Sequence, residues 1–365
     1  MVSVSRTEFF VAIAIGWLAI STALCQSPET TTSPAAQSYL KHALNIMQSN
    51  ALNKKSIDWV ALRRAVYQKA EGARTAADTY PAIAYGLSQL GEKHSGLQLP
   101  DGMPAEQKQA LYAAIRRELA RPAPARKASP FANSREISGH IEERNRRRFA
   151  YVYIPTCGGP YTEMQKNLGY FHEYADKLHA LVVGLEAQKP DGWIVDLRGN
   201  GGGNMYPMLA GIGAVLGEGD LGMFISGDGG RERWFYSRGK AGVAGHAQEA
   251  VSRPPFVFTP LPPVAVLFDR GTMSAAEAVA ISFVGRPRQR SFGESTGGYS
   301  TANEVFPLPD GAALVLCTGM EGDRNGHVYP YGLEPDVKVD QPETIAIQDR
   351  DATVLAALEW LSQQN

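Results

Sequence analysis

The chain has little of what several classes of protein require. Its 365 residues include only three cysteines, and neither a CxxC pair nor an HExxH helix occurs, so the common zinc sites lack their ligands. The formal net charge is −1, which provides no long-range field of one sign, so nucleic acid and anionic membrane surfaces are poor partners. The composition therefore implies no metal and no cofactor, and specificity must reside in a local site.

The first 25 residues differ from the rest of the chain. An uncharged apolar run from Phe9 to Leu24 follows Arg6 and Glu8 and ends close to Cys25. This pattern is typical of a secretory signal peptide, and residues 9–25 are also nearly long enough for an uncleaved membrane anchor. A lipid-modified Cys25 is a minority interpretation, because Leu24 is large where a small residue is expected. We therefore expect an exported protein that is periplasmic, secreted or anchored at its N-terminus.

Removal of Cys25 with a signal peptide would leave two cysteines, Cys157 and Cys317. An exported compartment permits a disulfide between them, whereas two buried free thiols are the alternative. The sequence leaves both possibilities open.

Composition and periodicity divide the chain into six segments. A Ser/Thr/Pro-rich stretch follows the apolar run, helical periodicity begins near Ser38, and strand signals begin at Phe149. We predict a signal peptide or anchor in 1–25, a flexible spacer in 26–37, a helical subdomain in 38–96, a charged connecting segment in 97–148, an α/β core in 149–345 and a C-terminal helix in 346–365.

The connecting segment is strongly basic between Arg116 and Arg148, and this basic stretch contains three prolines. Such charge runs are usually solvated helix ends or linkers. A lid bordering a binding site is the more specific hypothesis, because the segment lies between two candidate functional regions.

Beyond Phe149 short apolar strands alternate with helical segments. The strands are expected at 149–155, 192–197 and 264–268, with helices at about 161–188, 206–216 and 274–284. Alternation of this kind predicts a layered α/β core.

A glycine-rich turn follows the second of these strands. In Asp196-Leu-Arg-Gly-Asn-Gly-Gly-Gly203, several N–H groups without a neighbouring Cβ are presented at the start of a helix and could hold a negative oxygen. A dinucleotide site is disfavoured, because the sixth place of GxGxxG counted from Gly199 is Asn204.

A second turn presents a serine at the end of an apolar strand. Ser274 stands where the strand ending at Phe268 gives way to a helix, so its hydroxyl and the N–H of Ala275 can serve as nucleophile and oxyanion donor. The alternative is that Ser274 is only the N-cap of that helix, with Glu277 completing a capping box.

A reactive serine needs a base, and the chain offers seven histidines. His42, His172 and His179 fall on predicted helices, whereas His94 lies in a glycine-bounded loop, a better place for a catalytic group. If His94 is the base, we expect an apparent pKa within about two units of the ordinary ~6.5.

Six motifs in chain order resemble the tail-specific, or C-terminal processing, serine peptidases, to which the tricorn protease core is related. They span most of the chain beyond the apolar run and are Asp58-Trp-Val-Ala-Leu62, Leu90-Gly-Glu-Lys-His-Ser95, Ile194 to Gly203, Thr272-Met-Ser-Ala-Ala-Glu277, Phe292-Gly-Glu-Ser-Thr-Gly297 and Gly332-Leu-Glu-Pro-Asp336. The resemblance implies a ClpP/crotonase-like α/β core with a small N-terminal helical subdomain. It also implies Ser274 as nucleophile, and Ala275 with Gly201 or Gly202 as oxyanion hole.

The resemblance also bears on the base. The processing branch uses a Lys 25 residues after the serine, a place held here by Tyr299, and no Lys occurs between Arg270 and Tyr331. The chain is therefore similar to the branch that uses a Ser–His pair, with His94 as base.

Two features depart from the family pattern. Tyr329 holds the place of the expected acid, which leaves Ser95, Glu294 and Glu334 as candidates to orient the base. In addition, the segment between Gly96 and Phe149 is too short for the PDZ module that many relatives carry. We therefore expect the branch without a PDZ domain.

These observations predict an exported serine peptidase that acts on peptide or protein substrates through an acyl-enzyme. The alternatives are a ligand-binding or peptide-binding relative without catalysis, or an esterase on the same fold. An intact set of Ser274, His94 and the glycine turn favours the enzyme.

Overall fold

The computed structural model of the chain describes residues 31–119, 136–158, 164–253, 255–340 and 351–364. The expected signal peptide or anchor, including Cys25, lies outside the described residues. In the part of the chain that is described, no helix combines the length and the apolar character needed to cross a membrane.

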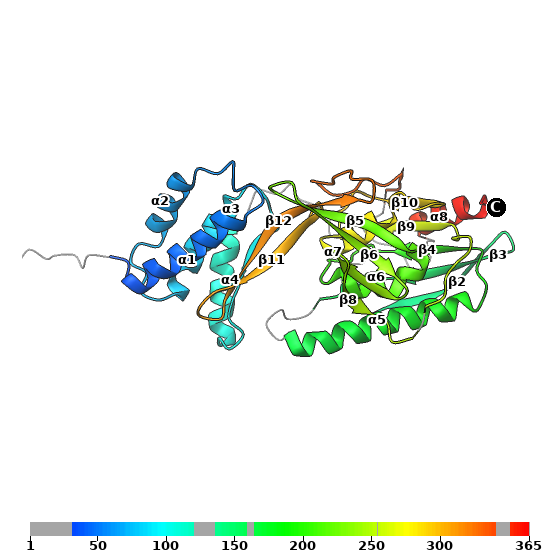
Figure 1. Cartoon of the computed structure of the whole chain (residues 1–365), viewed down its shortest axis with the longest axis horizontal. Helices are drawn as coiled ribbons and strands as arrows, with labels where there is room; N and C mark the ends of the chain where they lie inside the picture. The colour runs from blue at the N-terminus through cyan, green and yellow to red at the C-terminus, as the bar shows by residue number, and fades with distance from the viewer. Residues whose placement is uncertain (1–30, 120–135, 159–163, 254, 341–350, 365) are drawn as a thin grey trace, which may run out of the picture.

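Helices form the N-terminal part of the molecule, which occupies one end of the elongated chain in Figure 1. They are α1 (Pro34–Asn50), α2 (Trp59–Lys69), α3 (Tyr80–Ser88) and α4 (Ala105–Leu119), with a short 3₁₀ turn at Ala77–Thr79. The first helix begins within the stretch predicted as spacer, because the Ser33 side chain accepts the N–H of Ala36 and Pro34 holds the first helical position. Apolar side chains of these helices form a hydrophobic core of their own.

Two sheets make up the rest. The first has the order β1 (Gly96–Gln98), β12 (Ala313–Asp323), β5 (Gly219–Ser226), β6 (Arg231–Ser237), β7 (Lys240–Val243) and β8 (His246–Ala250), with β11 (Thr301–Pro307) also paired to β12. The second has the order β13 (Val337–Lys338), β10 (Gln289–Gly293), β9 (Val264–Phe268), β4 (Gly192–Asp196), β3 (Arg147–Tyr153) and β2 (Ser138–Arg144). All neighbours in the second sheet are parallel except β2 and β3.

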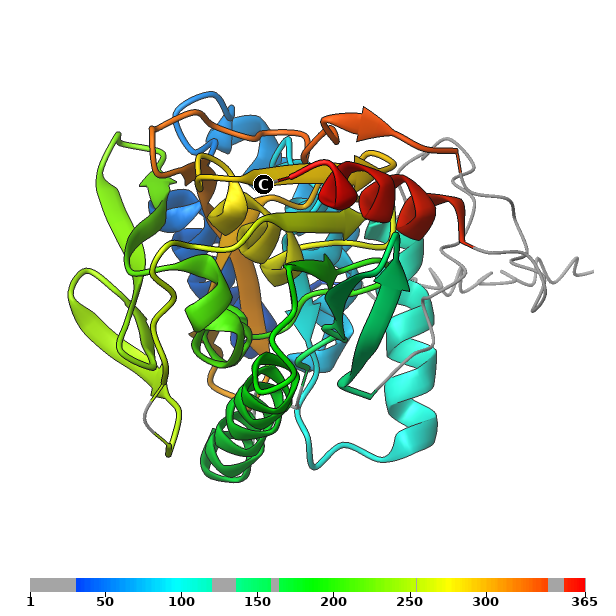
Figure 2. The ribbon, with the colours of Figure 1, turned by 90° about the vertical axis from the view of Figure 1, so that its right-hand side faces the viewer.

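The second sheet is covered on both faces. Successive side chains of a strand point to opposite faces, so Val195 packs in the core that includes α6 (Met205–Leu216) and α7 (Ala275–Phe283), whereas Ile194 packs on α8 (Ala352–Ser362). Figure 2 shows α8 lying across the face of this sheet opposite to α5 (Met164–Glu186). The predicted mixed α/β layered core is confirmed.

The described parts of the segment 97–148, residues 97–119 and 136–148, contain regular elements. They include α4, which packs against α3, and β2, which is the edge strand of the second sheet. Edge strands commonly carry charged residues, because these discourage pairing with other chains. Part of the charge that suggested a linker therefore belongs to the edge strand β2.

A long hairpin joins the two parts of the molecule. Strands β11 and β12 run from the core to the N-terminal helices (Figure 1), where Leu314 and Leu316 enter the helical core. At the turn, the carboxylate of Asp310 accepts hydrogen bonds from Tyr39 on α1 and Tyr80 on α3, at 2.7 and 2.5 Å. The hairpin is therefore bonded at its tip to both helices.

The two cysteines beyond the apolar run are both buried free thiols. Burial raises the pKa of the Cys317 thiol to about 12 and raises that of Cys157 further, so neither is a thiolate at neutral pH.

Candidate active site

Ser274 occupies a strained turn between β9 and α7. Its backbone has φ 54° and ψ −127°, a conformation that residues with a Cβ rarely adopt. The carboxylate of Glu277 accepts the Ser274 N–H at 2.9 Å, so the carboxylate half of the predicted capping box is formed. The positive φ shows that Ser274 is not an ordinary N-cap, because N-cap residues normally have extended dihedral angles.

The carboxylate of Glu277 holds the serine turn through hydrogen bonds. It is fully buried and accepts three further hydrogen bonds, from the Thr296 hydroxyl at 2.6 Å and from the N–H groups of Gly298 and Tyr299 at 2.8 and 2.7 Å. Burial raises the pKa of Glu277, and the hydrogen bonds oppose that rise by stabilising the charged form. One carboxylate therefore joins the serine turn to the loop that leads into β11.

The glycine turn after β4 is bonded to the serine turn. The N–H of Met273 donates to Asn200 O at 2.9 Å, and the N–H of Gly199 donates to the Asp269 carboxylate at 2.9 Å. A Cβ on Gly202 would lie 2.8 Å from the Cβ of Ser274, so only glycine allows this approach.

Hydrogen bonding separates the candidate oxyanion donors into two groups. The N–H of Gly201 donates to the Thr156 hydroxyl at 2.8 Å, and that of Gly202 donates to Asn200 Oδ1 at 2.9 Å. By contrast, the N–H groups of Ala275 and Gly203 have no acceptor among the described residues. The sequence prediction named Gly201 and Gly202 but not Gly203, because a run of three glycines does not show which N–H group faces the pocket.

Ser274 and His94 line the same pocket, which has a volume of about 860 Å³. Ala275, Gly203 and Thr301 also line it, whereas Gly201 and Gly202 do not. The structure thus brings together the predicted nucleophile, the predicted base and two unbonded N–H groups, although His94 precedes Ser274 by half the length of the chain.

The ring of His94 is held by residues of the loop and strand after the serine turn. Its Nδ1 lies 2.7 Å from the hydroxyl of Thr301, and its ring meets the ring of Tyr299 edge-on with centroids 5.4 Å apart. The backbone N–H of His94 donates to Glu92 at 2.6 Å. Thr301 carries no recognisable sequence signal, because only the fold of the β11–β12 hairpin brings it to the histidine.

Burial lowers the pKa of His94 to about 4, with a smaller lowering from Lys93, while a hydrogen bond with the Thr301 backbone acts in the opposite direction. This value is lower than the range we expected from the sequence, because the imidazole itself is partly buried although Gly91 and Lys93 of the same loop are exposed. His94 is therefore neutral at pH 7, with a lone pair available on one ring nitrogen.

The residues proposed to orient the base have other partners. The hydroxyl of Ser95 accepts the N–H of Cys317 at 2.8 Å, Glu294 pairs with Arg270 at 3.1 Å, and Glu334 accepts the hydroxyl of Ser295 at 2.6 Å. Tyr329, at the place of the expected acid, donates to Asp323 at 2.9 Å. The contact with Thr301 takes the place that an orienting carboxylate would have.

The basic residues at 147 and 148 lie away from this pocket. Arg147 donates to backbone oxygens at the end of α8, and Arg148 donates to Gln188 O at 3.0 Å. Neither lines the pocket, so these two arginines do not border the candidate site.

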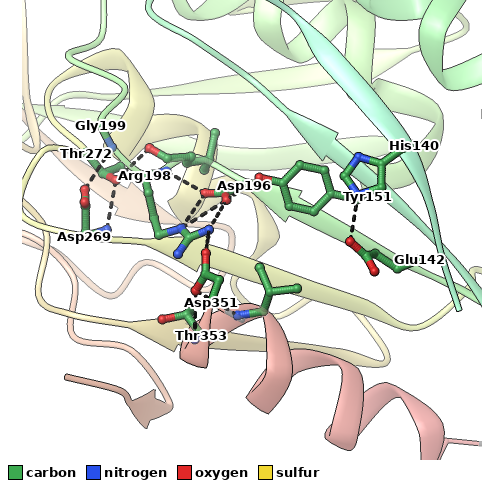
Figure 3. A network of polar contacts seen from close by, with 12 residues as sticks. His140, Glu142, Tyr151, Asp196, Arg198, Gly199, Asp269, Thr272, Asp351 and Thr353 are labelled. Atoms are coloured by element: carbon green, nitrogen blue, oxygen red, sulfur yellow. Dashed lines mark hydrogen bonds and ion pairs between the residues drawn. The ribbon is translucent and has the colours of Figure 1, made fainter. Parts of the chain in front are cut away.

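A buried ionic network surrounds Arg198, which belongs to the glycine turn (Figure 3). Arg198 is 1% exposed and pairs with Asp196 and with Asp351, the latter at 2.7 Å. Asp351 is also the N-cap of α8 and accepts the N–H of Thr353 at 3.0 Å, while Tyr151 donates to Asp196 at 2.7 Å. The network bonds the C-terminal helix to the strand that presents the glycines.

No cluster of three or more His, Cys, Asp or Glu that could hold a metal ion occurs within the described ranges.

The family model described as "Peptidase family S41" matches residues 148–339. The nisin-resistance protein of Lactococcus lactis subsp. lactis is 24% identical over 332 residues, covering 91% of this chain and 88% of that protein. The carboxyl-terminal-processing protease of Synechocystis sp. is 30% identical over 170 residues, covering 46% of this chain and 35% of that protein.

Two solved structures share the fold at low sequence identity. A lipoprotein from Streptococcus agalactiae aligns with a TM-score of 0.64 at 22% identity, covering 90% of this chain and 97% of that one. The photosystem II D1 C-terminal processing protease aligns with a TM-score of 0.55 at 17% identity, covering 86% and 96%.

Proposed function

Because the chain belongs to peptidase family S41, we propose that it is a serine peptidase that cleaves peptide bonds through an acyl-enzyme on Ser274, with His94 as general base. The observation that carries this proposal is the pocket that Ser274, His94, Ala275 and Gly203 line together. A nucleophile, a base and free N–H donors facing one cavity are the minimum that acyl transfer requires.

The tautomer of His94 follows from its contact with Thr301. If Nδ1–H donates to the Thr301 hydroxyl, Nε2 carries the lone pair that accepts the proton of Ser274. The serine oxygen then attacks the substrate carbonyl, and the protonated imidazole gives its proton to the leaving amine. Water repeats these steps to release the acyl group.

The oxyanion would be stabilised by Ala275 and Gly203. Their N–H groups are unbonded among the described residues and line the pocket, whereas those of Gly201 and Gly202 already donate to side chains. The proposal therefore retains Ala275, as expected from the sequence, and replaces Gly201 or Gly202 by Gly203 as the second donor.

Export is the second part of the proposal. It is supported by the apolar run between Phe9 and Leu24 and by the description of one structural relative as a lipoprotein. N-terminal sequencing of protein from the cell envelope tests it. A start near Gln26 supports export, whereas a full-length protein in the cytosol contradicts it.

A fluorophosphonate probe and two alanine variants test the catalytic assignment. Wild-type protein is expected to be labelled at Ser274, and Ser274→Ala and His94→Ala are each expected to reduce peptide hydrolysis by about 10⁴-fold or more. The double variant should be hardly worse than either single variant, because the two residues act as one unit. Tyr299→Phe is the control and should leave the chemical step nearly unchanged.

The outcomes separate the alternatives. A folded protein that is never labelled at Ser274 would favour a non-catalytic binding relative, and hydrolysis of esters but not of peptides would favour an esterase. A His94→Ala variant that keeps most of its turnover, beside an inactive Ser274→Ala, would mean that the nucleophile is right and the base is wrong.

A further inference from the structure

A buried carboxyl group faces the pocket and takes no part in the chemistry above. Glu321 on β12 is 3% exposed, yet it lines the same pocket as Ser274 and His94. Its Oε2 atom has no hydrogen-bond partner among the described residues. Because a buried polar atom without a partner is costly, a partner that arrives with the substrate would explain its position.

Backbone pairing and hydrogen bonds connect Glu321 to the residues around Ser274 and His94. Its Cα pairs with that of Phe224 on β5, which also lines the pocket. Its N–H donates to Ser300 O at 3.1 Å. Ser300 stands between Tyr299, which donates to the Glu277 carboxylate beneath Ser274, and Thr301, which contacts His94. Glu321 therefore lies on the side of the pocket where the acyl-enzyme would form.

The surroundings of Glu321 combine apolar walls with negative charge. Apolar side chains contribute much of the lining, namely Phe171, Met205, Tyr206, Phe224 and Val243. Burial raises the pKa of Glu321 well above its ordinary value. The like charge of Glu277 raises this pKa further. The exposed Arg231, Glu232 and Glu304 also line the pocket, so its exposed charged groups are one cation and two carboxylates.

A pocket lined by apolar side chains and by a buried acidic group suits a side chain with an aliphatic stem and a cationic head. Lys and Arg have this form. Their ammonium or guanidinium group would supply the missing hydrogen bond and would stabilise the ionised form of Glu321. A neutral side chain of the same length would occupy the pocket but leave the carboxyl group without a partner.

We propose that Glu321 is the specificity-determining residue of the subsite for the residue that donates the scissile carbonyl, and that this subsite selects Lys or Arg. The inference rests on the proposed peptidase function. It concerns the choice of substrate and leaves the catalytic roles of Ser274 and His94 as described.

The first test compares substrates that differ at one position. Peptides carrying Lys, Arg or the neutral isostere norleucine before the scissile bond are hydrolysed by the full-length wild type, by Glu321→Gln and by the control Glu232→Gln. We expect the wild type to favour Lys over norleucine by roughly 10-fold or more in kcat/KM, and Glu321→Gln to lose most of that preference. Glu232→Gln removes an exposed carboxylate of the same pocket and should change the preference by less than about threefold, because solvent screens it.

The second test does not depend on catalysis. Calorimetry measures binding of the same Lys and norleucine peptides to Ser274→Ala and to the double variant Ser274→Ala with Glu321→Gln. Preference for Lys in the first protein and its loss in the second support the inference even if wild type never turns over, in which case only the proposed function fails. Equal kcat/KM and equal binding for the two peptides with an intact Glu321 would overturn the inference, whether or not the Gln variant folds.

Discussion

At the scale of single residues, His94 holds a proton more weakly than a histidine in water does. Its pKa is lowered to about 4 by burial, so the imidazole remains an uncharged base well below neutral pH. The protonated form is inactive in the proposed mechanism, so activity is lost only as pH falls through this lowered pKa.

The pH profile checks this directly. We predict that kcat/KM stays nearly constant between about pH 7 and pH 5 and reaches half its plateau near pH 4, far below the ordinary ~6.5. Circular dichroism at each pH serves as the control for unfolding. A half-maximum near pH 6.5 in folded protein would show that His94 is more hydrated than the structure indicates, or that another group limits the rate.

Thr301 is the positioning residue for His94. Thr301→Val keeps the shape and strand preference but removes the hydroxyl within 2.7 Å of Nδ1. We predict a fall in kcat/KM of roughly 10- to 100-fold, since the buried ring loses its partner and can turn. The hydrogen bond that raises the pKa of His94 comes from the Thr301 backbone, which both residues retain, so the acid limb of the pH profile should stay near pH 4 in this variant.

Thr301→Ser restores the hydroxyl and should recover most of the activity. A valine variant with wild-type kinetics would mean that another group orients the ring.

The sequence could single out the serine turn and the histidine loop, because glycine, strand and helix signals surround both, and the two do line one pocket. It could not identify Thr301, since no local pattern distinguishes this threonine from others and its role depends on a hairpin that returns from the far end of the chain. The same holds for Gly203, which only the hydrogen bonds of Gly201 and Gly202 single out.

At the scale of secondary structure, the buried ionic network makes α8 part of the support of the glycine turn. Asp351 caps this helix and pairs with Arg198, which is itself buried next to Asp196. Loss of Asp351 would leave the Arg198 guanidinium with one carboxylate fewer and would remove the cap of α8.

We predict that Asp351→Ala lowers the free energy of unfolding by about 1–3 kcal/mol, from the lost cap and the lost charged hydrogen bond. Chemical denaturation measures this. Glu359→Gln is the matched control, because Glu359 lies on the same helix and pairs with Arg144 in solvent, and it should leave stability nearly unchanged. Equal stability of both variants and wild type would show that α8 is not coupled to the turn.

Patterns of apolar residues predicted the elements of the core well. The strands β3, β4 and β9 and the helices α5, α6, α7 and α8 occur within a few residues of their expected bounds. The charged edge strand β2 and the helix α4 were not recognised, because exposed charges mask the periodicity of elements that bury only one side.

At the scale of the whole molecule, the proposed base and nucleophile come from different parts. His94 follows the N-terminal helices, whereas Ser274 belongs to the core, and the β11–β12 hairpin connects the two (Figure 1). Asp310 at the hairpin turn is bonded to Tyr39 and Tyr80, so it holds the helices on the hairpin.

Asp310→Ala should therefore reduce both stability and turnover although it is remote from the pocket lining. We predict a loss of about 1–2 kcal/mol in unfolding free energy, because two buried tyrosine hydroxyls lose their acceptor, together with a lower kcat. Asp310→Asn keeps one carbonyl acceptor and should fall between wild type and the alanine variant. Unchanged kinetics in Asp310→Ala would show that the placement of His94 does not depend on this contact.

Strand β12 contacts the histidine loop and also lines the pocket. Its Cys317 N–H donates to Ser95, next to the base, and Glu321 lies four residues further along the same strand. The register of β12 against β11 shifts between these two residues, because Ala302 pairs with Gly319 and Asn303 pairs with Cys317, which leaves Thr318 as an extra residue on β12. Removal of Thr318 would therefore change the face of the sheet on which Glu321 lies relative to Cys317. The distance between the proposed base and the buried carboxyl group thus depends on one backbone irregularity, whereas the preference for a cation depends on the Glu321 side chain.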